Sequence, residues 1–505
     1  MRKLLIVALA ATCLFAAAPK EPKLVLFIVV DQCRYDYLTR FRDEFHGGFD
    51  RLLKNGASFA STQVDFFPTL TAPSHAAMLT GASPSVSGIV GNDWFDRREG
   101  IHVTSVLDKT TKIVGAAGTD GASPRRLLVS TVGDELRKAT GGRSRVIGIS
   151  IKDRSAILLT GQKANGAYWY DEPSGLFVSS SYYGPDLPTW VRSFDDSRPS
   201  LQYAGVTWTG HKFPDAGRPL YKMIERSPFG NDLTEAMAEL AIKAEKLGQR
   251  DETDLLALSF SSTDYVGHDY GPDSPELHDT LLRTDRILDR LFEEVDRQIG
   301  LAKVVVVMTS DHGVAPVAEV NNARKMPGGR SLLTDISDAV QAALSKKYGP
   351  GKWVGGCWDL LVYLNRDLLS QKKIDPAEAN RTAADAMLHI PHIARAYTRE
   401  QLGNPQALWD ETGRRMKDGF HPEFGADIEF IPEPYWVFTD QKTTHGSTYN
   451  YDSHVPLIFM GAGIRRSRQY ELVRTNDIAP TLAEILGVPK PSGSSGRSLR
   501  EILSR

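Results

Sequence analysis

The sequence predicts an α/β protein with a doubly wound, mostly parallel central sheet that helices cover on both faces. Continuous apolar runs, typical of buried strands, occupy residues 23–32, 145–154, 254–264, 303–313 and 455–464. Helix-like stretches alternate with these runs, at 127–139, 232–248, 274–298 and 477–487. Ionisable residues close the first four runs, and in such sheets ligands bind at the carboxyl ends of the strands. We therefore expect the functional groups on one edge of the sheet.

The chain has 505 residues, of which 41% are hydrophobic, and its formal net charge is −2. This composition is typical of a globular protein with a large core. The near-neutral balance gives no electrostatic reason to expect nucleic acid as a partner. We expect a single domain over residues 19–505 with two insertions near the functional edge. An irregular stretch rich in Tyr, Gly, Pro and Ser covers about 155–230, and a smaller α+β unit covers about 318–440.

The N-terminus has the pattern of a secretory signal peptide. A basic start, a short apolar run and small residues occupy residues 1–18. No other segment reaches about 18 uninterrupted apolar residues, so the mature chain is expected to have no transmembrane segment and to be periplasmic or secreted. Cys33 and Cys357 would remain after cleavage, either paired or as free thiols. The oligomeric state stays open.

Thr71 stands at the junction of a loop and a predicted helix. In "TAPSH", Pro73 suits the first turn of a helix, residues 74–80 are helix-compatible and Gly81 is a plausible stop. Thr71 is then expected at or near the N-cap, beside free backbone N–H groups and the positive end of the helix dipole. The residue is either an ordinary cap or a hydroxyl held for chemistry on an anion.

Three carboxylates and three imidazoles lie at or near the ends of the predicted strands. Asp264 and His268 are four residues apart and would share one face of a helical turn. The remaining candidates are Asp31, Asp311, His312 and His445. Each Asp or His position, taken alone, is also compatible with a hydrogen-bonded turn. Together they suffice for two sites of Asp/His composition, which suit Zn²⁺ or a similar divalent ion.

Two such ions can clamp an in-line displacement, and Thr71 would then be the nucleophile. Lys152 and Arg154 are two apart in what reads as extended chain, so both would point to the same side and bind phosphoryl oxygens. Asn92, after a glycine-rich turn, would add an amide donor. The alternatives are a solvated strand end for Lys152 and Arg154, and a turn former for Asn92.

The ordered set of Asp31, "TAPSH", "STDYVGHDYG", "SDHG" and "THGS" resembles the alkaline phosphatase superfamily, in its type I phosphodiesterase/nucleotide pyrophosphatase-like branch. The resemblance implies one alkaline-phosphatase-like catalytic domain with two Zn²⁺ ions. It assigns Asp264, His268 and His445 to one ion. It assigns Asp31, Thr71, Asp311 and His312 to the other, with Thr71 transiently phosphorylated.

Within this branch, "GND" and "SIKDR" resemble the threonine-nucleophile alkaline phosphatases. The resemblance implies that Asn92, Lys152 and Arg154 bind a dianionic phosphate monoester, so the expected substrates are small-molecule phosphate monoesters. A phosphodiesterase or nucleotide pyrophosphatase of the same fold is the first alternative, and a non-catalytic metal-stabilised binding protein is the second. "TAPSH" lacks the sulfatase motif. His454 is a second candidate for the place of His445, and His75 is expected to be structural.

Overall fold

The computed structural model describes residues 21–504 except 119, 405, 407 and 409. The predicted signal peptide, residues 1–18, lies outside the described residues. Within them, no helix combines the length and the apolar character needed to cross a membrane. Cys33 and Cys357 are both free thiols, so they do not pair with each other.

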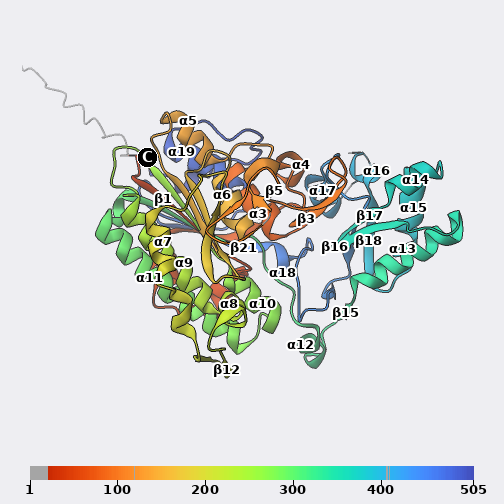
Figure 1. Ribbon diagram of the computed structural model, residues 1–505, viewed down its shortest axis with the longest axis horizontal. Helices are drawn as coiled ribbons and strands as arrows, with labels where there is room; N and C mark the ends of the chain where they lie inside the picture. Colours follow the sequence, from red (N-terminus) through yellow and green to blue (C-terminus); the bar gives the residue numbers. More distant parts are fainter. Residues whose placement is uncertain (1–20, 119, 405, 407, 409, 505) are drawn as a thin grey trace, which may run out of the picture.

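A central sheet of 11 strands forms the body of the molecule (Figure 1). Its order is β22-β2-β21-β14-β1-β13-β8-β9-β10-β6, and β23 pairs with β2 beside β22. In this order the strands are β22 (Ser467–Gln469), β2 (Ala57–Gln63), β21 (His454–Gly461), β14 (Val304–Thr309), β1 (Leu24–Val30), β13 (Asp254–Phe260), β8 (Val146–Ser150), β9 (Gly166–Asp171), β10 (Leu176–Ser180) and β6 (Ile113–Val114), with β23 at Val473–Arg474.

The centre of the sheet is parallel, as predicted, and its flanks are mixed. β14, β1, β13, β8 and β9 run parallel to their neighbours within this group. The run at 455–464, read among the parallel strands, forms β21, which is antiparallel to both β14 and β2. A strand buried on both faces has the same apolar composition in either direction, so the sequence pattern does not reveal this. The amino end of β21 therefore lies at the edge where the parallel strands end.

Both faces of the sheet are covered by helices because alternate side chains of each strand point to opposite faces. Leu24, Leu26, Ile28 and Val30 of β1 pack with α9 (Pro228–Ala244) and α11 (Pro275–Gln298). Val25, Phe27 and Val29 pack on the other face with α3 (Thr71–Thr80), α5 (Val132–Ala139) and α19 (Ile478–Leu486). Each fully buried aliphatic side chain contributes roughly 2 kcal/mol through removal from water. The predicted helices lie within a few residues of these bounds.

The stretch 155–230 differs from the irregular insertion that its composition indicated. β9 pairs in parallel with β8 and β10 returns antiparallel, so both extend the central sheet. Tyr168, Tyr170 and Phe177 supply buried aromatic side chains of these short strands, and the Gly and Ser residues at the strand ends hid the pattern. The other elements of the stretch are α6 (Asp153–Thr160), α7 (Thr189–Asp196), β11 (Thr207–Trp208), β12 (His211–Lys212) and α8 (Gly217–Glu225).

Between 318 and 440 the chain leaves the central sheet and builds a second, four-stranded sheet, here called the inserted sheet (Figure 1, right). Its strands, in spatial order, are β16 (Val354–Trp358), β17 (Leu361–Leu364), β19 (Ile428–Pro432) and β18 (Ile393–Thr398), all antiparallel. Its helices are α13 (Leu333–Tyr348), α14 (Arg366–Gln371), α15 (Pro376–Met387), α16 (Arg399–Leu402) and α17 (Glu411–Gly419). One apolar cluster joins this unit to Ala72 and Ala76 of α3.

The remaining helices and strands are short. They are α1 (Tyr35–Arg40), α2 (Gly48–Asn55), α4 (Pro84–Ser87), β3 (Asp93–Asp96), β4 (Ile101–Thr104), β5 (Leu107–Asp108), β7 (Gly121–Ala122), α10 (Ser262–Tyr270), α12 (Ala318–Ala323), β15 (Gly329–Ser331), β20 (Trp436–Phe438) and α18 (Asn450–Ser453).

Glu429 of β19 is a buried acid in the inserted sheet. The residue is 3% exposed, and its Oε2 has no hydrogen-bond partner within the described part of the chain. Burial raises the pKa of this carboxyl to about 8, against a smaller opposing effect of Arg399. Above the ordinary carboxyl pKa the unfolded chain loses this proton while the folded protein keeps it, so the free energy of unfolding falls as pH rises.

Glu429→Gln removes this proton linkage while keeping the shape of the side chain. The variant should gain stability relative to wild type by about 2 kcal/mol between about pH 6 and pH 8. Urea unfolding of both proteins at the two pH values measures the change, with the exposed Glu293→Gln as control. A difference that does not vary with pH would show that Glu429 is ionised in the folded protein.

Candidate active site

The predicted ligands meet at one edge of the central sheet, although their elements are far apart in sequence. Asp31 follows β1, Asp311 and His312 follow β14, and α10 brings Asp264 and His268 just after β13. His445 reaches the same edge from the loop before β21, because that strand runs antiparallel to β14. The side chains form two groups of three, each with ligand atoms within 4.8 Å of one another.

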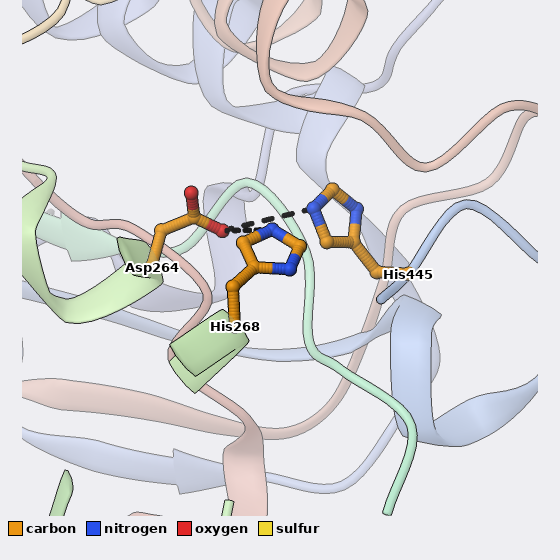
Figure 2. Close-up of side chains that lie close together, drawn as sticks. All are labelled: Asp264, His268 and His445. Atoms are coloured by element: carbon orange, nitrogen blue, oxygen red, sulfur yellow. Dashed lines mark ion pairs between the residues drawn. The ribbon is translucent and has the colours of Figure 1, made fainter. Parts of the chain in front are cut away.

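The first group consists of Asp264, His268 and His445 (Figure 2). Asp264 and His268 are four apart in α10 and so share one face of the helix, as predicted. Asp264 Oδ1 lies 3.2 Å from His268 Nε2 and 3.6 Å from His445 Nε2. In Figure 2 the two imidazoles approach this oxygen from different elements, one from α10 and one from the loop before β21.

The second group consists of Asp31, Asp311 and His312, all fully buried. His312 Nε2 lies 3.3 Å from Asp311 Oδ2 and 3.7 Å from Asp31 Oδ1. Neither of these two carboxylate oxygens has a hydrogen-bond partner among the described residues. The His312 ring stacks on His445 at 3.5 Å between centroids, so the two groups adjoin.

Thr71 belongs to the second group by position. α3 begins at Thr71 itself with Leu70 as N-cap, so Thr71 is the first helical residue rather than the cap. Its Oγ1 lies 3.4 Å from His312 Nε2. The helix ends at Gly81, whose φ of +68° suits glycine, as the sequence indicated. The hydroxyl therefore lies at the positive end of a helix and beside a ligand group.

Asn92 supports the start of α3. Its Oδ1 accepts a hydrogen bond from Ala72 N at 2.9 Å. Because the amide oxygen accepts this hydrogen bond, the Nδ2 group of Asn92 is left to donate to another partner.

Lys152 and Arg154 are near the groups, but not in the predicted conformation. β8 ends at Ser150 and α6 begins at Asp153, so Lys152 is an N-cap residue and Arg154 lies in the first helical turn. The predicted strand 145–154 therefore includes the last residues before this helix and its first two residues. Lys152 Nζ lies 2.9 Å from Asp31 Oδ2 and 2.6 Å from Asp264 Oδ2, which makes it a bridge between the two groups. Arg154 is more exposed, and its Nε has no partner among the described residues.

The charges of the two groups do not balance without bound cations. Three carboxylates, none more than 4% exposed, share one buried lysine. Burial and the charge of Asp31 raise the pKa of Asp311 well above its usual range. Burial lowers the pKa of His312 to about 4 and, with His312 and His268 nearby, holds the pKa of His445 well below its usual range. The pKa of His268 is raised instead, because the charge of Asp264 and a hydrogen bond to it outweigh the effect of burial. Neutral imidazoles, as at His312 and His445, and carboxylates are the donor set that a divalent cation requires.

The imidazoles are also oriented as in metal sites. Nδ1 of each candidate ligand pairs with a backbone carbonyl, at 2.9 Å for His268 with Thr443 O, 3.0 Å for His312 with Gly313 O and 2.8 Å for His445 with Thr69 O. A carbonyl only accepts, so Nδ1 donates and Nε2 carries the lone pair. These residues therefore fit two divalent ions.

Two further histidines lie outside these groups. His454 Nε2 pairs with Ala60 O at 3.0 Å, and its ring stacks on Tyr35. His75 uses both ring nitrogens, with Thr71 O at 2.9 Å and Ser259 Oγ at 3.0 Å. His75 thus ties α3 to the neighbouring strand β13.

Three residues that sequence reasoning missed hold the groups in place. Gln32 donates from Nε2 to Asp264 Oδ1 at 2.6 Å and from its backbone N to Asp311 Oδ1 at 3.1 Å. Thr69 accepts from His445 and donates from Oγ1 to Ser447 O at 2.8 Å. Asp452 accepts from Ser447 N at 2.9 Å. Gln32 directly follows Asp31, which is the only sequence signal that could have drawn attention to it.

Comparison with known proteins agrees with the family resemblance that the sequence motifs indicate. Residues 25–454 match the model of a family described as Type I phosphodiesterase / nucleotide pyrophosphatase. The alkaline phosphatase PhoV of Synechococcus elongatus is 36% identical, over 97% of this chain and 94% of the relative. The alkaline phosphatase PafA of Elizabethkingia meningoseptica is 33% identical, over 97% and 96%. The crystal structure of wild-type PafA has a TM-score of 0.90 at 32% identity and covers 96% of this chain and 100% of that one.

Metal content tests the ligand groups directly. We expect about two equivalents of Zn²⁺ per chain after gel filtration, and about one in His445→Ala, because the first group would keep only two ligands. Elemental analysis by mass spectrometry measures this. The matched control is His454→Ala, at the start of β21, which should retain both ions. Loss of an ion in the control but not in His445→Ala would contradict the grouping.

Proposed function

The chain belongs to the type I phosphodiesterase/nucleotide pyrophosphatase family of the alkaline phosphatase superfamily, and from this premise we propose that it is an exported, zinc-dependent alkaline phosphatase. Its substrates would be small-molecule phosphate monoesters. The observation that carries the proposal is the position of Thr71 Oγ1, at a helix N-terminus and 3.4 Å from a ligand of the second group.

Each ligand group would hold one Zn²⁺. The ion on the side of the attacking oxygen would be bound by Asp31, Thr71, Asp311 and His312. The ion on the side of the leaving oxygen would be bound by Asp264, His268 and His445. When bound, the ions would supply Lewis-acid stabilisation of these two oxygens. Gln32 and Lys152 contact both groups, and this supports a fixed separation between the attacking and leaving positions.

Thr71 would attack phosphorus in line. A bond forms between Thr71 Oγ1 and phosphorus while the ester P–O bond breaks and the alcohol leaves, which gives a phosphothreonine that water then hydrolyses. Thr71 is 1% exposed, so the phosphoryl end of a substrate has to enter first. The amide hydrogens of Asn92 and the N-terminus of α3 would receive its non-bridging oxygens.

Preference for monoesters would come from Lys152 and Arg154. Two cationic side chains stabilise a dianionic phosphoryl group more strongly than they stabilise a monoanionic diester. The unpartnered Nε of Arg154 supports this role, because a buried donor without a partner is costly unless a ligand satisfies it. A phosphodiesterase would use the same ligand groups without depending on these two side chains, and a non-catalytic binding protein would need no nucleophile.

Removal of the nucleophile tests the covalent step. Thr71→Ala should lower kcat/KM for 4-nitrophenyl phosphate by at least about 10³-fold, whereas Thr71→Ser keeps a hydroxyl and should retain more of the activity. Acid quenching during turnover, followed by peptide mass spectrometry, should locate one phosphoryl group on Thr71. Rapid turnover by Thr71→Ala would refute this mechanism. A chelated wild-type sample should lose activity and regain it with Zn²⁺.

The ratio of monoester to diester hydrolysis tests the substrate class. Wild type should favour 4-nitrophenyl phosphate over bis(4-nitrophenyl) phosphate, and Lys152→Ala or Arg154→Ala should lower this preference by about ten- to a hundredfold. Lys138→Ala, an exposed lysine of α5, is the control. Faster hydrolysis of the diester by wild type would favour the phosphodiesterase alternative.

A further inference from the structure

The inserted sheet supplies one wall of the candidate active site. The turn between β16 and β17 and the residues beside it, 358–361, are here called the hairpin tip. The hairpin tip lies against Gly446 and Leu70, because a Cβ built at Gly446 would lie 3.5 Å from Leu360 and 3.6 Å from Leu70. A Cβ at Gly91 would lie 3.6 Å from Leu361. Gly446, Leu70 and Gly91 directly adjoin His445, Thr71 and Asn92 in sequence.

Asp359 stands at the turn of the hairpin tip. Its φ of +50° belongs to the left-handed region, which Asp and Asn tolerate better than other side chains do. Its neighbour Leu360 is buried, whereas Asp359 is half-buried. Among the described residues, no side chain forms an ion pair or a hydrogen bond with the Asp359 carboxyl group. The carboxylate is therefore free to meet a ligand.

Two of the three charged residues that act on the Asp359 carboxyl group belong to the active site. Burial and then the charge of Asp93 raise its pKa to about 6, while Arg154 and His268 lower it. Arg154 is proposed to bind the phosphoryl group, and His268 belongs to the group on the side of the leaving oxygen. Asp359 therefore lies within electrostatic range of both ends of the bond to be broken, and at neutral to alkaline pH it is negatively charged.

The direction in which a substrate enters decides which of its parts meets this charge. Thr71 and the second ligand group are buried, so the phosphoryl end occupies the interior of the site. In-line attack by Thr71 puts the leaving oxygen on the opposite side of phosphorus, toward the exterior. The alcohol part of the substrate is then next to the hairpin tip.

We propose that Asp359 is a specificity-determining residue, which makes the enzyme favour phosphate monoesters whose leaving group is neutral or carries an amine over those whose leaving group is anionic. This inference rests on the proposed phosphatase function. The negative charge repels a carboxylate or second phosphate on the alcohol part and attracts an ammonium group there. Because Asp359 has no ion pair with Arg154, it acts on the substrate and not by holding that arginine.

The monophosphate esters of ethanolamine, ethylene glycol and glycolate test this, since their leaving groups are of similar size and carry a positive, no and a negative charge. In wild type, kcat/KM should fall in that order. In Asp359→Asn, which keeps a residue suited to positive φ, the ratio of the ethanolamine to the glycolate ester should fall by about three- to tenfold. High salt should reduce the wild-type ratio in the same direction.

Binding gives a second measurement that is independent of turnover. In a Thr71→Ala background, calorimetric titration of the same esters should show the same change in ratio on adding Asp359→Asn. Asp385→Asn, an exposed acid of α15, should leave all ratios unchanged. Turnover of the esters with a ratio unaltered by Asp359→Asn would overturn this inference alone. No turnover of any of them by wild type would overturn the proposed function as well.

Discussion

Three buried carboxylates with a single buried lysine beside two of them are the constraint on which the rest of the site depends. Lys152 bridges Asp31 and Asp264, and this leaves Asp311 without a compensating cation. Burial of unpaired charge costs several kcal/mol per group, and bound divalent ions would offset this cost. The imidazoles with backbone-bonded Nδ1 atoms and the polar bridges from Gln32 fit the same requirement. The active site is thus also a part of the structure whose stability depends on its ligands.

Much of this arrangement could be predicted from sequence, because the relevant signals are local. Asp31 and Asp311 end apolar strands, Asp264 and His268 share a helical face, and Thr71 precedes a proline suited to a first turn. These features predicted the fold class, the functional edge and the two ligand groups before any tertiary contact was known. The family resemblance added the division of the ligands between the groups.

What could not be predicted depends on contacts between distant segments. The direction of β21 follows from its neighbours in the sheet, not from its composition. Lys152 was expected in extended chain, but the helix that starts at Asp153 turns it inward, onto two carboxylates more than 100 residues away in sequence. Thr69 and Asp359 carry no motif. Both residues reach the candidate active site through tertiary structure. A loop carries Thr69, and the hairpin of the inserted sheet carries Asp359, to the functional edge of the central sheet.

The central position of β21 also has a consequence for synthesis of the chain. β21 separates β2 from β14, and His445 lies just before it, so both the sheet and the first ligand group stay incomplete until the last quarter of the chain has been made. Pairing across such long sequence separations is slow to form. A nascent or truncated chain that lacks this region contains Thr71 but neither His445 nor the completed central sheet. The order of synthesis therefore delays assembly of the first ligand group until nearly the whole polypeptide has been made.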